Sequence, residues 1–139
     1  MNKDYKTRDQ IIRDNSASFD TTSIGGIKQF KRLKPMALQK LVDQDFADPE
    51  DYQNESPTIK EFLEFAQNHP ELKPTFSGYT VDVNREDYRV SIDQIVLENP
   101  FIDTRNGLID LIELVKNADD TYDYSANENG DTAVGIWWD

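Results

Sequence analysis

The stretch FSGYTVDVNREDYRVSIDQIVL, residues 76–97, decides the fold. Apolar and polar side chains alternate over residues 76–83 and again over 88–97, which is the period of a β-strand with one buried face. Turn-forming residues separate the two runs. The alternation slips by one residue at Asp93-Gln94, which predicts a β-bulge or the end of the strand there. We therefore expect two antiparallel strands joined as a hairpin.

Apolar spacing and terminal residues predict three helices around this hairpin. The first covers residues 35–44, because Pro35 suits the first turn of a helix. The second has Ser56 as its N-cap and Pro57 at its first helical position. The third covers residues 104–117. Its predicted buried face consists of Leu108, Ile109, Leu111, Ile112 and Val115.

A second hairpin is predicted near the C-terminus. Residues 122–125 and 132–138 flank Asn129-Gly130, a dipeptide that favours the tight turn of a hairpin. The order α-α-β-β-α-β-β predicts an α+β fold in a single domain. The expected architecture is a four-stranded, mainly antiparallel sheet with about three helices on one face.

Charge divides the chain into two parts. The formal net charge of the whole chain is −12. Residues 1–34 carry eight basic and four acidic residues, a net charge of +4, and residues 35–139 carry the remaining −16. Residues 1–27 are rich in turn and linker residues, with apolar spacing for only a short helix. We expect them to form a mobile basic N-terminal arm, followed by an acidic α+β domain over residues 28–139.

Composition excludes several classes of protein. The chain has no cysteine, so disulfides, thiolate metal sites and cysteine nucleophiles are excluded. No apolar run reaches the ~18 residues that a membrane-spanning helix needs. The first residues lack the apolar stretch of a secretory signal. A cytoplasmic protein without a membrane partner is expected.

Candidate motifs for cofactors do not match their templates. The acidic stretches 43–51 and 125–136 depart from the calcium-loop pattern at several ligand positions. Residues 22–28 lack the spacing of a phosphate-binding loop. His69 is the single histidine, and we expect it to cap a helix end. We therefore predict no catalytic residue, no metal and no cofactor, and a protein that is not an enzyme.

Two features indicate a surface that binds a partner. Acidic residues are concentrated between positions 43 and 64. The terminal Trp137-Trp138 pair lies on a predicted strand, where adjacent residues point to opposite faces, so one tryptophan should be buried and the other exposed. Exposed tryptophans are frequent anchors of interfaces. The predicted partner-binding residues are Asp48, Glu50, Asp51, Glu61, Glu64, Trp137 and Trp138.

The sequence FADPEDYQNESPTIKEFLEF, residues 46–65, resembles a group of small acidic proteins of Gram-positive bacteria and their phages and plasmids. Gly78-Tyr79, the DYRVSI stretch of residues 87–92 and the terminal WWD resemble the same group. The resemblance covers roughly residues 30–139. That group has no established activity, so the resemblance implies an accessory role in a mobile genetic element and identifies no catalytic residue.

Three hypotheses for function follow. The first is a non-enzymatic accessory factor whose acidic face docks a basic protein. The second is a DNA mimic that inhibits a nuclease or another DNA-binding protein. It ranks second because Lys60, Lys73 and Arg85 interrupt the acidic residues. The third, a nucleic-acid binder that uses the basic arm, is disfavoured because the arm stands beside a body of net charge −16. No direct contact with nucleic acid is expected, and no oligomeric state is predicted.

Overall fold

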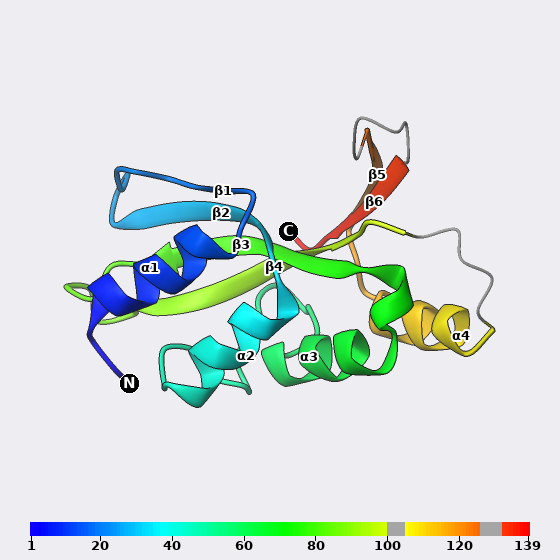
Figure 1. The fold of residues 1–139 in the computed structure, drawn as a ribbon, viewed down its shortest axis with the longest axis horizontal. Helices are drawn as coiled ribbons and strands as arrows, with labels where there is room; N and C mark the ends of the chain where they lie inside the picture. The colour runs from blue at the N-terminus through cyan, green and yellow to red at the C-terminus, as the bar shows by residue number, and fades with distance from the viewer. Residues whose placement is uncertain (100–104, 126–131) are drawn as a thin grey trace.

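The computed structural model describes residues 1–99, 105–125 and 132–139, and in these ranges it shows an α+β fold built on one antiparallel sheet (Figure 1). The sheet has six strands in the order β1-β2-β3-β4-β6-β5. Their bounds are β1 (Ser18–Phe19), β2 (Ile27–Leu33), β3 (Pro74–Val81), β4 (Arg89–Leu97), β5 (Asp120–Ser125) and β6 (Thr132–Trp137). The fold class and the antiparallel sheet are confirmed. The predicted four strands omit β1 and β2.

The part of the chain that the structure describes contains four α-helices and one short 3-10 helix, where about three helices were predicted. Their bounds are α1 (Tyr5–Asp14), α2 (Pro35–Asp43), α3 (Ile59–Asn68), η1 (Pro70–Leu72) and α4 (Arg105–Leu114). The α-helices lie along one side of the sheet (Figure 1). The hydrophobic core fills the space between them and the sheet, where Phe62 of α3 contacts both Phe76 of β3 and Trp138, with ring centroids 5.4 Å apart in each pair.

The hairpin of β3 and β4 forms as predicted, and the predicted bulge lies at Asp93. Ser77 pairs with Gln94 and Gly78 pairs with Ile92, so Asp93 is the extra residue of β4. The two strands approach closely at this point, because a Cβ atom at position 78 would overlap the Ser91 carbonyl oxygen. Only glycine fits there. The Asp93 carbonyl accepts a hydrogen bond from the Trp138 N–H (3.0 Å).

The prediction that residues 1–27 form an arm outside the domain is wrong. Helix α1 buries Ile11 and Ile12 in the core, and β1 pairs with β2 at the edge of the sheet. The neighbouring Arg8 and Asp9 are also buried, as an ion pair. The folded part of the chain therefore begins before residue 28, with α1.

The start of α3 differs from the prediction. Its N-cap is Thr58, and Ser56 and Pro57 precede the helix. The Thr58 hydroxyl accepts from the Glu61 N–H and the Glu61 carboxylate accepts from the Thr58 N–H, both at 3.1 Å. This reciprocal capping box satisfies two backbone donors and outweighs the preference of proline for the first turn.

The C-terminal elements match the prediction in type and differ in burial. Strands β5 and β6 pair as a hairpin, and the predicted Asn129-Gly130 turn lies outside the described residues, as does residue 104. The predicted apolar face of α4 is only partly buried. Leu111 and Val115 pack against the core, whereas Leu108, Ile109 and Ile112 are exposed.

Candidate functional site

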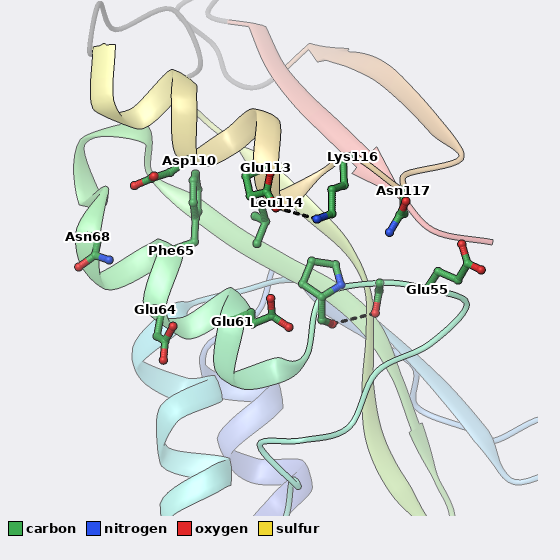
Figure 2. Close-up of a pocket in the computed structure, with 12 residues that line it drawn as sticks. Glu55, Glu61, Glu64, Phe65, Asn68, Asp110, Glu113, Leu114, Lys116 and Asn117 are labelled. Carbon is green, nitrogen blue, oxygen red and sulfur yellow. Dashed lines mark hydrogen bonds and ion pairs between the residues drawn. The ribbon is translucent and has the colours of Figure 1, made fainter.

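A groove of about 400 Å³ runs between α3 and α4 (Figure 2). Phe65 and Leu114 contribute apolar surface to it. Five carboxylates and one lysine line it, and this set is called the acidic groove: Glu55, Glu61, Glu64, Asp110, Glu113 and Lys116. These carboxylates come from the loop before α3, from α3 itself and from α4, so the fold brings together segments that lie far apart in the sequence.

Local structure fixes the position of the α3 carboxylates. Glu61 is held by the capping box with Thr58. Glu64 follows one turn later and therefore lies on the same side of the helix. Glu55 and Glu64 have no hydrogen-bond or ion-pair partner within the ranges that the structure describes. Their charges are available to an external cation.

His69 joins the end of α3 to α4. Its Nε2 lies 2.6 Å from Asp110 Oδ2 and its Nδ1 lies 3.3 Å from Glu71 Oε1, while the imidazole itself is largely buried. The ring also contacts Phe65, at a centroid distance of 5.1 Å. His69 is the C-cap residue of α3, as predicted, but its ring contacts carboxylates of other segments rather than helix carbonyls. It therefore links the end of α3 to α4, the two helices that flank the groove.

Lys116 is the cation of the acidic groove, and its ammonium pairs with Glu113 at 2.6 Å (Figure 2). Both side chains are exposed, so the pair adds little to stability. Glu113 raises the pKa of Lys116 above its usual value through this hydrogen bond and its charge. With one charge neutralised by Lys116, the acidic groove keeps a strong negative excess.

An apolar stripe lies beside the acidic groove on α4. It consists of Leu108, Ile109 and Ile112, whose exposed fractions are 59%, 57% and 61%. Helical residues three or four apart share a face, so these three form one stripe, while Asp110, Glu113 and Leu114 form another that faces α3. The two stripes border each other on the surface of α4, where Ile109 and Glu113 are one turn apart.

The predicted acidic residues are divided between two places. Glu61 and Glu64 lie in the acidic groove. Asp48 and Asp51 line a separate hollow, beside Arg89. Burial raises the pKa of the Asp51 carboxyl, and the charge of Arg89 opposes this rise.

Glu50 is exposed, and it lines neither the acidic groove nor the hollow beside Arg89. The prediction missed Glu55, Asp110 and Glu113 as members of the acidic groove. Asp110 and Glu113 are three residues apart on a predicted helix. This spacing places them on one face of the helix, and it was the one signal in the sequence that could have identified them.

The two tryptophans lie on opposite sides of the sheet, as the alternation of strand residues predicts. Trp138 is 1% exposed and lies in the core. Trp137 is partly exposed and lines a hollow on the other side together with Tyr79 and Gln94. A surface that includes the acidic groove therefore does not include Trp137 as well, and Trp138 is not exposed to a partner.

Neither a cluster of metal ligands nor a membrane-spanning helix is found in the residues that the structure describes. Within residues 1–99, 105–125 and 132–139, no group of three or more histidine, aspartate or glutamate side chains is placed to hold a metal ion. Half of the candidate calcium stretch 125–136 lies outside these ranges. In the same ranges, no helix has the length and apolar character needed to span a bilayer.

Comparison with family models, with curated proteins and with solved structures found no match to this chain.

Proposed function

We propose that this protein is a non-enzymatic, cytoplasmic accessory factor of a mobile genetic element, and that it docks a basic protein on α3 and α4. The observation that carries the proposal is the acidic groove, with five carboxylates and one lysine, beside a helix that exposes three large aliphatic side chains. Solvent-exposed aliphatic side chains in a contiguous patch are typical of interaction surfaces.

The charges indicate the chemistry of the partner. Glu55 and Glu64 lack a partner in the described part of the chain, so lysine or arginine side chains of a second protein would pair with them without breaking an existing contact. The aliphatic side chains of α4 add apolar surface, whose burial contributes about 25 cal/mol per Å². A basic segment that also carries apolar residues matches both features.

A capture experiment with two variants tests the proposal. The first variant carries Glu55→Gln, Glu64→Gln and Glu113→Gln in the acidic groove. The control carries Asp14→Asn, Asp43→Asn and Glu86→Gln, three exposed acids outside the groove, so both variants lose the same net charge. We expect the groove variant to lose a basic protein that the wild type and the control both capture from host lysate. Equal loss from both variants would show that net charge alone is responsible.

Duplex DNA as a competitor separates this proposal from the DNA mimic, the second hypothesis. A mimic occupies the DNA site of its target, so duplex DNA would displace the captured protein. A basic partner that stays bound in the presence of DNA supports the docking role. Raised salt should weaken capture in both cases, because the contacts of exposed charges are screened.

A further inference from the structure

A second hollow, of about 490 Å³, lies where α1 meets β2 and the end of β3, and it is called the Arg8 pocket. It is unrelated to the acidic groove. The residues of the predicted basic arm build much of it. Its lining includes Arg8, Asp9, Lys28, Thr80 and the loop residues Thr21–Ser23.

Three charged side chains form a chain of contacts in this pocket. Arg8 Nε donates to Asp9 Oδ1 at 3.0 Å, and Lys28 Nζ donates to Asp9 Oδ2 at 3.2 Å. The side chains of Arg8 and Asp9 are only 6% and 8% exposed. Burial of a charge is costly unless it is paired, and here one carboxylate is shared by two cations.

Arg8 and Lys28 have hydrogen-bond donors that are not used within the pocket. Arg8 Nη1 donates to the Val81 carbonyl at 3.2 Å, whereas Nη2 has no partner within the described ranges. Lys28 Nζ has three protons and makes one hydrogen bond. Both oxygens of Asp9 already accept a hydrogen bond from a cation. Donors are therefore left over near the floor of the pocket, and its buried carboxylate is already engaged.

The rim of the pocket adds hydroxyl groups and one further acid. Thr21, Thr22 and Ser23 are exposed, and their hydroxyls make no hydrogen bond within the part of the chain that the structure describes. The carboxylate of Asp82 lies on the rim and accepts a hydrogen bond from the Asn84 N–H at 3.0 Å. The formal charge of the lining is thus balanced. Selectivity would come from the unused donors of the buried Arg8 and the partly exposed Lys28 rather than from net charge.

We propose that the Arg8 pocket binds a compact oxyanion group, a phosphoryl or carboxylate group of a small molecule. Arg8 Nη2 and Lys28 Nζ donate to its oxygens, and the hydroxyls of Thr21–Ser23 close over it. Hydrogen bonds of this kind, between a cationic donor and an oxyanion, are about twice as strong as those between neutral groups. The site does not depend on the docking function proposed above.

Titration of the full chain with inorganic phosphate and, separately, with acetate tests the site by amide NMR at constant ionic strength. We expect the amide signals of residues 21–28 and 80–84 to shift and to saturate, with an apparent Kd of about 1 mM or lower for the favoured anion. The anion that saturates at the lower concentration identifies the class of ligand. Failure of both anions to produce saturable shifts would overturn the proposal.

Substitutions test the location of the site. Lys28→Gln, and separately the triple change of Thr21, Thr22 and Ser23 to alanine, should weaken binding about tenfold. These changes are preferred to substitution of Arg8, whose loss would leave Asp9 buried without its closest cation. The matched control is Lys31→Gln, an exposed lysine on the same strand that does not line the pocket. Equal weakening by Lys28→Gln and Lys31→Gln would contradict the proposal.

Discussion

The Trp138 ring meets the Phe62 ring edge to face, with centroids 5.4 Å apart and an interplanar angle of 76°. This contact connects the residue that follows β6 to the middle of α3. Edge-to-face pairs add about 0.5–1.5 kcal/mol beyond the burial of their area. The Trp138 Nε1–H is buried without a hydrogen-bond partner, so the ring stabilises the fold through packing alone.

Trp138→Ala should therefore destabilise the protein by about 3–5 kcal/mol, because it leaves a large cavity in the core. Trp138→Phe should cost less, since it keeps an aromatic ring and removes the unpaired N–H. The measurement is the free energy of unfolding in urea. The control is Trp137→Ala, which should have a clearly smaller effect because Trp137 is partly exposed. Equal losses from the two alanine variants would contradict the assignment of Trp138 to the core.

Ile12 tests whether the N-terminal segment belongs to the domain. Its side chain is fully buried, whereas that of Ile24, in the same segment, is exposed. We expect Ile12→Ala to lower the free energy of unfolding by about 2–5 kcal/mol. Ile24→Ala should change it by no more than about 0.5 kcal/mol. If both variants unfold like the wild type, α1 does not contribute to the core in solution.

Asp93 should make stability depend on pH in an unusual direction. Burial raises the pKa of the Asp93 carboxyl to about 6, and the charge of Asp139 adds to the rise. Since the folded state then holds the proton more tightly than the unfolded state, stability falls as pH rises from about 4 to 6. Above that range, the Asp93 carboxylate is ionised in its buried site, which lowers the stability of the folded state.

Asp93→Asn removes this penalty. At pH 7 it should raise the free energy of unfolding by about 1–2 kcal/mol, a value discounted for the solvent that still reaches the carboxylate. At pH 3.5 the two proteins should be nearly equal. Urea denaturation at both pH values measures the difference, with the exposed Glu86→Gln as the control. A gain that is the same at both pH values would exclude ionisation of Asp93 as its cause.

The apolar stripe on α4 should matter for binding and little for folding. Changing Leu108, Ile109 and Ile112 together to glutamine should leave the free energy of unfolding within about 1 kcal/mol of the wild type, because exposed substitutions have small effects. Capture of the basic partner should weaken, as measured by the retained fraction in the pull-down. Leu111→Ala is the contrasting variant, expected to destabilise the protein. Full capture by the triple variant would remove the stripe from the proposed interface.

The candidate sites were harder to predict from the sequence than the strands. Glu61 and Glu64 were predicted as partner-binding residues, but the other carboxylates of the acidic groove come from positions 55, 110 and 113. No local spacing links Asp110 and Glu113 to the three glutamates, which lie far from them in the sequence. The Arg8 pocket was missed for a related reason, since Arg8 and Lys28 resemble ordinary surface charges until α1 packs against the sheet.

Local patterns determined the hairpin of β3 and β4, because alternation with period 2 is a property of neighbouring residues and the slip in phase marks the bulge at Asp93. The sequence also determined the helix that starts at Pro35 and the opposite orientations of Trp137 and Trp138. Tertiary structure alone decided that α1 joins the domain and that residues 27–33 form strand β2, because lysine and arginine interrupt the apolar pattern of β2 and only packing reveals which residues it buries. It alone also decided that three of the five residues of the predicted apolar face stay exposed, since Leu111 and Val115 pack against the core whereas Leu108, Ile109 and Ile112 do not.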